Sequence, residues 1–183
     1  MKTIVMKSWR LLALLVSVVA VTACEEDDDD VPVARMTTAE FVQQAAASDV
    51  FEIEAGKLAT ANSTTPEVVT FGENLIDDHT ETSQTLMTLA HQNSVNVPLP
   101  SRQTLPQDKQ AILTRLESKA GGDFDLDFVA VQLEAHQQAI TLFEKASNEL
   151  EHQAFRDFAK NTLPTLQAHL EMARKLRTQL SEG

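Results

Sequence analysis

The sequence predicts an all-α protein whose folded part is a four-helix bundle. Apolar residues recur at helical spacing in four long stretches, and no segment alternates apolar and polar residues between turns as a half-buried strand would. The chain has only 5 glycines and 6 prolines among 183 residues, which argues against a loop-dominated protein. This length suffices for one domain with a sizeable core.

Helix-start signals place the first two helices. Thr37 is followed three residues later by Glu40, which is the spacing of a capping box. Thr65 precedes Pro66, and proline is favoured at the first helical position because its missing N–H would have no partner there. The two expected helices cover about residues 37–61 and 65–92.

A proline-rich connection separates this pair from a second pair of helices. A short helix is expected over about 107–119, before Gly121-Gly122. Asp123 and Asn148 can cap the last two long helices. Pro164 lies inside the last helix and is expected to kink it, because proline removes one backbone hydrogen bond.

The expected layout is two helices, a connection of about 30 residues, and two more helices. Short links make antiparallel hairpins, whereas the long link allows the second hairpin to start from either end of the first. This layout is typical of a ferritin-like four-helix bundle, with a long crossover that contains a short helix between the second and third long helices. A plain up-down-up-down bundle is the alternative.

The N-terminal residues 1–23 have the pattern of a bacterial lipoprotein signal peptide. Basic residues precede a largely apolar run from Leu11 to Val21, which is shorter than the roughly 20 residues that a membrane span needs. The run ends at Val21-Thr22-Ala23-Cys24, which resembles a lipobox. We therefore expect Cys24 to become the lipidated N-terminus that attaches the protein to a membrane, most simply the outer membrane of a bacterial envelope.

An acidic tether is expected over 24–36, ahead of a helical domain over 37–181. Six consecutive acidic residues, Glu25 to Asp30, repel one another and favour a solvated segment. The run resembles the surface-export signal of some lipoproteins, and a plain spacer is the alternative. The sequence leaves the membrane face and the oligomeric state open.

Composition excludes several classes of function. The net charge of −12 argues against a duplex nucleic-acid binder, and it would suit a cationic envelope partner or another protein. A single cysteine excludes a disulfide framework and a cysteine-based zinc site. We find no phosphate-binding loop, nucleophile elbow or zincin motif, so a non-enzymatic protein is favoured.

Each long helix places one strongly polar residue on its apolar stripe. Residues 7 or 11 apart point in directions only about 20° apart, and this test selects the four candidates. They are Glu52, His79, His136 and His169. The first three are expected near mid-height of the bundle, whereas His169 falls about one layer away unless the Pro164 kink corrects its height.

Asp78, Asp125 and Gln132 lie on or beside the same stripes and are expected to support the imidazoles. Two interpretations remain open. One is a buried polar network in which a carboxylate accepts hydrogen bonds from imidazoles and sets the register of the bundle. The other is a site for zinc, iron, copper or manganese, because neutral imidazoles and a carboxylate are suitable ligands. The paired Glu-x-x-His motifs of di-iron proteins are not found.

Several short motifs in order resemble those of a large family of bacterial secreted proteins and lipoproteins, a domain of unknown function in the ferritin-like superfamily. The resemblance covers about residues 37–178. It implies a ferritin-like fold and an envelope location but no activity, and position 128, often Tyr in that family, is Phe here. The motifs are FEIEAGKLA around Glu52, Asp77-Asp78-His79-Thr80, Gly121-x-x-Phe124-Asp125-x-x-Phe128, Gln132-x-x-x-His136 with Leu142-Phe143-Glu144, and Leu163-Pro164-Thr165-Leu166-x-x-His169-Leu170.

We expect a non-enzymatic envelope lipoprotein whose helical domain binds a partner or stabilises the envelope. The alternative is a metal-binding or metal-dependent redox protein with its ion in the bundle core. A third expectation is a pH-sensitive bundle, because charging of buried histidines near pH 6 would loosen it.

Overall fold

The computed structural model describes residues 35–182, and every regular element in that part of the chain is helical. The expected signal peptide, the lipidated Cys24 and nearly all of the acidic tether lie outside the described residues. Within residues 35–182, no helix combines the length and the apolar character needed to cross a bilayer. The elements are α1 (Thr38–Asn62), α2 (Pro66–Gln92), the short 3₁₀ helix η1 (Arg102–Thr104), α3 (Gln107–Glu117), α4 (Gly121–Glu149) and α5 (Gln153–Glu182).

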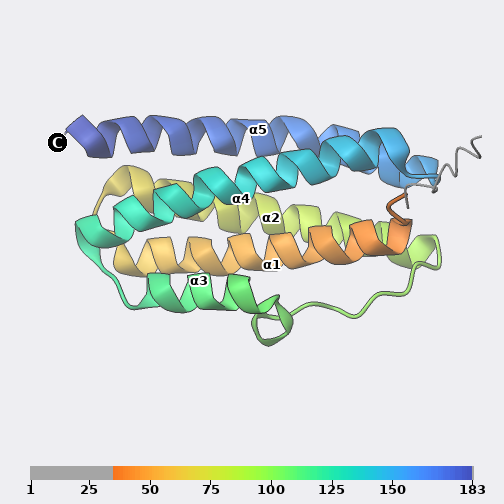
Figure 1. The fold of residues 1–183 in the computed structure, drawn as a ribbon, viewed down its shortest axis with the longest axis horizontal. Coiled ribbons are helices and arrows are strands. Elements are labelled where there is room, and N and C mark those ends of the chain that lie inside the picture. Colours follow the sequence, from red (N-terminus) through yellow and green to blue (C-terminus); the bar gives the residue numbers. More distant parts are fainter. Residues whose placement is uncertain (1–34, 183) are drawn as a thin grey trace, which may run out of the picture. The chain divides into compact units, whose positions relative to one another are not determined.

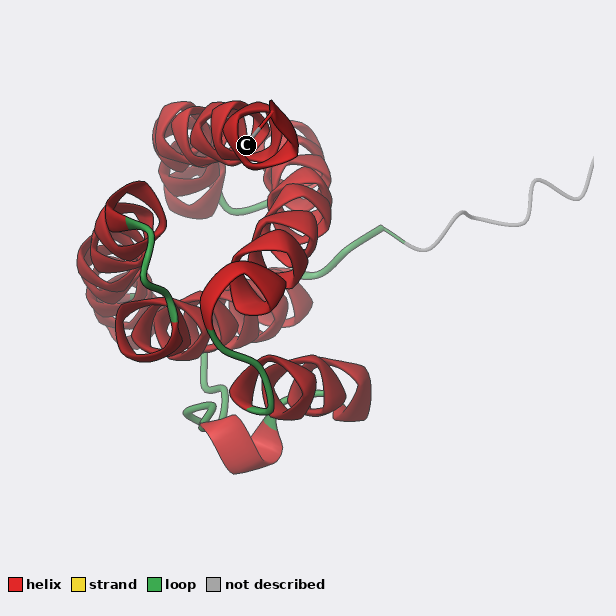
Figure 2. Ribbon diagram, turned by 90° about the vertical axis from the view of Figure 1, so that its left-hand side faces the viewer, coloured by secondary structure: helices red, strands yellow, loops and turns green. Residues whose placement is uncertain are grey.

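Four long helices form a bundle from two antiparallel hairpins, α1 with α2 and α4 with α5 (Figure 1). The hairpins meet where α1 packs on α4 and α2 packs on α5. The segment between α2 and α4 returns along the bundle, so α2 and α4 point in the same direction. Figure 2 shows the four long helices around a common axis, with η1 and α3 outside them against α1. The all-α prediction and the long crossover are thus confirmed for the described residues.

The start signals of the first two helices act differently. The capping box is confirmed, because the Thr37 side chain accepts from the Glu40 amide at 3.2 Å and the Glu40 carboxylate accepts from the Thr37 amide at 2.7 Å. Pro66 opens α2 as expected, but the Thr65 hydroxyl does not cap that helix. It donates instead to Oδ2 of Asp125 on α4, at 2.5 Å, and so ties the two hairpins together.

The starts of the last two helices differ from the prediction. Helix α4 begins at Gly121, where a φ of 57° redirects the chain, so Asp123 lies in the first turn and not at the cap. Asn148 lies inside α4 and its side chain donates to the Glu144 carbonyl, so α5 begins only at Gln153. At the start of α4 the local cap signal of Asp123 was outweighed by Gly121, which adopts a backbone conformation that most residues avoid.

Two hydrophobic clusters fill the bundle, one toward each end. The first is built around Phe51, Phe71, Phe124 and Phe128, and the second around Phe41, Phe143, Phe155 and Phe158. On each long helix, buried polar residues lie at or beside the boundary between the two clusters, whereas Asp125 lies farther inside the first cluster. The members of this polar layer are Asp49, Glu52, His79, Gln132, His136 and His169.

Helices α1 and α2 approach closely beside the polar layer. A Cβ atom at Gly56 would lie 2.6 Å from the Gly72 carbonyl oxygen, and one at Gly72 would lie 2.7 Å from the Ala59 Cβ. Any larger residue at either glycine would force the helices apart. These two glycines therefore fix the spacing of the helices that carry Glu52 and His79.

Candidate metal centre

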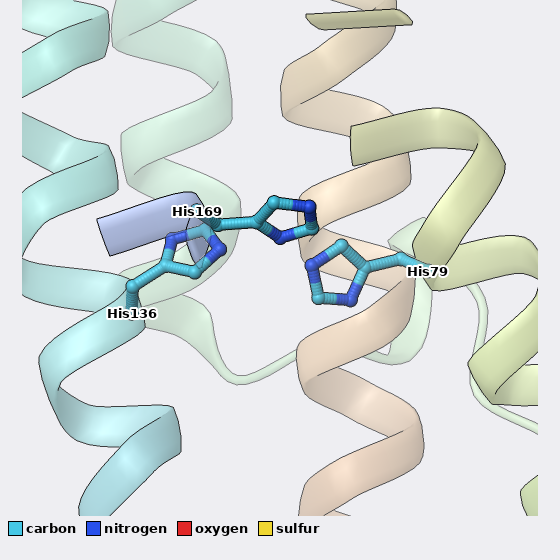
Figure 3. Close-up of side chains that lie close together, drawn as sticks. All are labelled: His79, His136 and His169. Carbon is cyan, nitrogen blue, oxygen red and sulfur yellow. The ribbon is translucent and has the colours of Figure 1, made fainter. Parts of the chain in front are cut away.

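Three imidazoles from three helices converge in the polar layer. His79 comes from α2, His136 from α4 and His169 from α5, and all three are buried (Figure 3). Their ring centroids are 5.2 to 5.8 Å apart. One nitrogen from each ring lies within 4.8 Å of the corresponding nitrogens of the other two. His169 thus reaches the same layer as the other two, although its distance along α5 suggested a different height.

Each ring is oriented through one nitrogen by a hydrogen bond to an acceptor outside the trio. His79 Nδ1 bonds to Oδ1 of Asp49 at 2.9 Å, and His169 Nε2 bonds to Oδ2 of Asp78 at 2.8 Å. His136 Nδ1 donates to the backbone carbonyl of Gln132 at 3.0 Å. A carbonyl only accepts, so the proton of the neutral His136 ring is on Nδ1 and its Nε2 carries a lone pair.

The second nitrogen of each ring is buried and has no hydrogen-bond partner. These atoms are His79 Nε2, His136 Nε2 and His169 Nδ1. A buried polar atom without a partner costs about 1–3 kcal/mol. Three such costs in one layer are difficult to reconcile with a purely structural network, in which partners would be expected.

Burial keeps two of the rings neutral. It lowers the pKa of His136 to about 3, and the nearby His79 acts in the same direction. It also lowers the pKa of His169 to about 4, together with His136 and against the opposing effect of the Asp78 hydrogen bond. Both rings are therefore uncharged at neutral pH and offer a lone pair.

His79 forms a buried pair with Asp49 and behaves differently. Burial opposes a charge on His79, but the Asp49 hydrogen bond and the neighbouring Glu52 outweigh it and raise the pKa of the imidazole. The pair therefore holds a proton more firmly than the other two rings do. An ion bound at His79 Nε2 would have to displace a proton from this pair.

Glu52 of α1 is fully buried in the same layer, and neither of its carboxyl oxygens has a hydrogen-bond partner. Burial raises the pKa of this carboxyl group, against the opposing effects of nearby His79 and of the neighbouring Gln132 side-chain amide. Glu52 does not belong to the group of atoms within 4.8 Å of one another, which contains the three histidines alone. It is thus a neighbour of the trio, and the closest convergence is of imidazoles.

The predicted supporting residues take three different positions. Asp78 orients His169, as the sequence suggested. Gln132 orients His136 through its backbone carbonyl, while its buried side-chain amide makes no hydrogen bond. Asp125 is buried near the start of α4 and bonds to Thr65, so the structure does not place it with the imidazoles.

Asp49 is the functional residue that the sequence reasoning missed. It is buried on α1, four residues after Ala45 and three before Glu52, and therefore lies on the same stripe. That spacing was a usable signal. Its pairing with His79 across 30 residues could not be read from the spacing along one helix.

The residues present suit a transition-metal ion. Neutral imidazole is a good ligand for zinc, copper, iron and nickel. At ligand distances of about 2.1 Å, two nitrogens on one ion are at most about 4.2 Å apart, so the trio would close by movements on the order of 1 Å. A hydrogen bond from the outer nitrogen of a ligating imidazole to a carboxylate or carbonyl is the usual support of such a site.

Comparisons with known proteins agree with the helical architecture. A family model described as "Domain of unknown function (DUF4142)" matches residues 25–176. The fold is similar to that of CopM in its Cu(II)-bound form, with a TM-score of 0.67 and 16% identity over 80% of this chain and 99% of that one. It is similar to a putative secreted DUF305 protein from Streptomyces coelicolor, with a TM-score of 0.67 and 9% identity over 78% of this chain and 92% of that one. No curated protein matches the sequence.

The neutral histidines predict a pH-dependent stability of the metal-free protein. As the pH falls below about 6.5, the unfolded chain takes up a proton at position 136, whereas the folded protein does not until about pH 3. The contribution of His136 to stability therefore falls steadily as the pH drops from about 6.5 to about 3, and part of it is lost between pH 7 and 5. His136→Gln should cost about 2 kcal/mol less stability at pH 5 than at pH 7, measured by chemical unfolding with a chelator present. The exposed His152→Gln variant is the control, and an equal cost of His136→Gln at both pH values would contradict the prediction.

Proposed function

The chain belongs to the DUF4142 family, and for this member we propose that the bundle core binds a single transition-metal ion. The observation that carries the proposal is the convergence of three buried imidazoles from three helices. One nitrogen of each ring lies within 4.8 Å of nitrogens of the other two, and one nitrogen of each ring has no hydrogen-bond partner. The other nitrogen of each ring is already held by a hydrogen bond, so the nitrogens without partners are the ones available to an ion. A cation between them would satisfy all three at once. At His79 the ion would first displace a proton, because Asp49 and Glu52 raise the pKa of that imidazole.

The proposed ligand atoms are His79 Nε2, His136 Nε2 and His169 Nδ1. We propose Glu52 as the fourth ligand, because its buried carboxyl group lies in the same layer and lacks a partner. Binding an ion would then compensate the cost of burying the acid, since a cation favours the ionised carboxylate. The bound ion would supply its positive charge to the otherwise unsatisfied layer.

The similarity to CopM in its Cu(II)-bound form makes copper the first ion to test. The donors are nitrogen and oxygen atoms without a thiolate, which suits Cu²⁺ and Zn²⁺. The order of the helices and the long crossover further support a ferritin-like arrangement, with one ion in place of a di-iron pair. The function that follows is metal binding without catalysis.

We also propose that the protein carries out this function in the cell envelope, anchored through a lipid on Cys24. The apolar run and the lipobox-like sequence before Cys24 support export and lipidation. The similarity to a putative secreted protein is in keeping with an envelope location.

Metal content is the direct test of the site. Purified protein dialysed against Cu²⁺ or Zn²⁺ should retain one ion per chain, and its melting temperature should rise by roughly 8 °C at a free ion concentration a hundred times the Kd. The double variant His79→Ala, His136→Ala should retain none, because two of the three imidazoles are gone. Elemental analysis and thermal melts measure both effects.

The matched control removes two histidines that lie on the surface. The double variant His91→Ala, His152→Ala should retain the ion, because both side chains are exposed. The proposal fails if the purified wild-type protein contains no metal and its melting temperature does not change when copper, zinc, iron or manganese is added. Equal loss of metal in both double variants would point to surface binding and would also contradict it.

Glu52→Gln tests the proposed fourth ligand. Burial favours the uncharged carboxylic acid in the metal-free protein, and an amide of similar size should leave its melting temperature nearly unchanged. The affinity for the ion should fall at least about tenfold, because an amide is a poorer ligand than a carboxylate. Titration calorimetry measures the affinity, and an unchanged Kd would remove Glu52 from the ligand set.

Cys24→Ser tests the anchor. The unmodified protein should be recovered in the membrane fraction and incorporate a labelled fatty acid, since each buried methylene of an acyl chain contributes about 0.8 kcal/mol to membrane binding. The variant should lose both properties. If the Cys24→Ser variant is still recovered in the membrane fraction, and the wild type incorporates no labelled fatty acid, Cys24 is not the lipid anchor.

A further inference from the structure

A polar groove runs along the outside of the α2–α5 seam. It has a volume of about 950 Å³ and extends from Gln92, at the end of α2, to Asp78, the residue before His79. Phe158 and Leu89 line it together with a series of threonine, asparagine and glutamine side chains. One end of the groove therefore lies at Asp78, the hydrogen-bond partner of His169.

The charges along this groove all have one sign. Its ionisable residues are Asp78, Glu81 and Asp157, and no lysine, arginine or histidine lines it. Carboxylates and hydroxyl oxygens are groups that a hydrated cation contacts readily. A groove lined by one sign of charge concentrates ions of the opposite sign.

Asp78 links the groove to the candidate metal centre. Its side chain is 47% exposed, whereas the side chain of its hydrogen-bond partner His169 is 1% exposed. The Asp78 carboxylate thus lines the groove and also bonds to the His169 imidazole, with 2.8 Å between Oδ2 and Nε2. The next residue on α2 is His79 itself.

The other sides of the layer are less suited to cations. Along the bundle axis, a hydrophobic cluster lies on either side of the polar layer. A depression of about 620 Å³ lies beside α1, α4 and the crossover, but its lining contains Lys109 and no acidic residue. The positive charge of Lys109 would repel a cation there.

We infer that divalent cations reach the three histidines through the α2–α5 groove, guided by its carboxylates, with Asp78 as the last carboxylate before His169. This inference rests on the proposed metal-binding function and adds the route by which the ion arrives. Glu81 and Asp157 attract the ion electrostatically and are not ligands of the final site.

The rate of Cu²⁺ uptake tests the route. The double variant Glu81→Gln, Asp157→Asn removes two charges from the groove without touching any of the three imidazoles. Stopped-flow absorbance at low ionic strength should show uptake about three- to tenfold slower than in the wild type, and added salt should reduce the difference. The amount of Cu²⁺ bound at equilibrium should stay at one per chain.

A matched variant separates the route from net charge. Glu134→Gln, Glu144→Gln removes two charges from the exposed face of α4 and should leave the rate nearly unchanged. Equal slowing in both variants, or no slowing in the groove variant, would overturn the inference while the metal-binding function stands. A wild-type protein that binds no Cu²⁺ or other ion at equilibrium would instead overturn the proposed function, and the route with it.

Discussion

The burial of three imidazoles in one layer of an otherwise apolar bundle is the constraint on which the rest of the structure depends. Polar groups in a core are destabilising unless they are hydrogen-bonded. One nitrogen of each ring is bonded to Asp49, Asp78 or the Gln132 carbonyl. The other nitrogen of each ring has no partner. These unpartnered nitrogens cost the fold stability, and the cation of the proposed function would restore it.

The surrounding fold positions this layer from several directions. Phenylalanine-rich clusters at either end of the bundle hold the four helices in register, and Phe71 contacts the rings of both His136 and His169. The close approach at Gly56 and Gly72 sets the spacing of α1 and α2. Because closely packed helices transmit small shifts in their positions, residues outside the trio determine how the three imidazoles lie relative to one another.

Electrostatics links the site to its surroundings. Burial keeps the rings of His136 and His169 neutral, while His79 and Asp49 hold a proton that an ion bound as proposed would displace. Metal affinity should therefore fall as the pH is lowered. On the outside, carboxylates line the α2–α5 groove, whereas the depression beside α1, α4 and the crossover is lined by Lys109 and no acidic residue.

The sequence by itself determined the helices, their approximate bounds, the crossover and the inward direction of Glu52, His79, His136 and His169, because apolar periodicity and capping signals are local properties. Periodicity gives a direction around one helix axis but not the height relative to neighbouring helices. Only the tertiary structure therefore brought His169 level with the other rings, paired Asp49 with His79 and sent Asp125 to Thr65. It also decided which nitrogen of each ring is free, since that depends on acceptors contributed by other helices or by a backbone carbonyl.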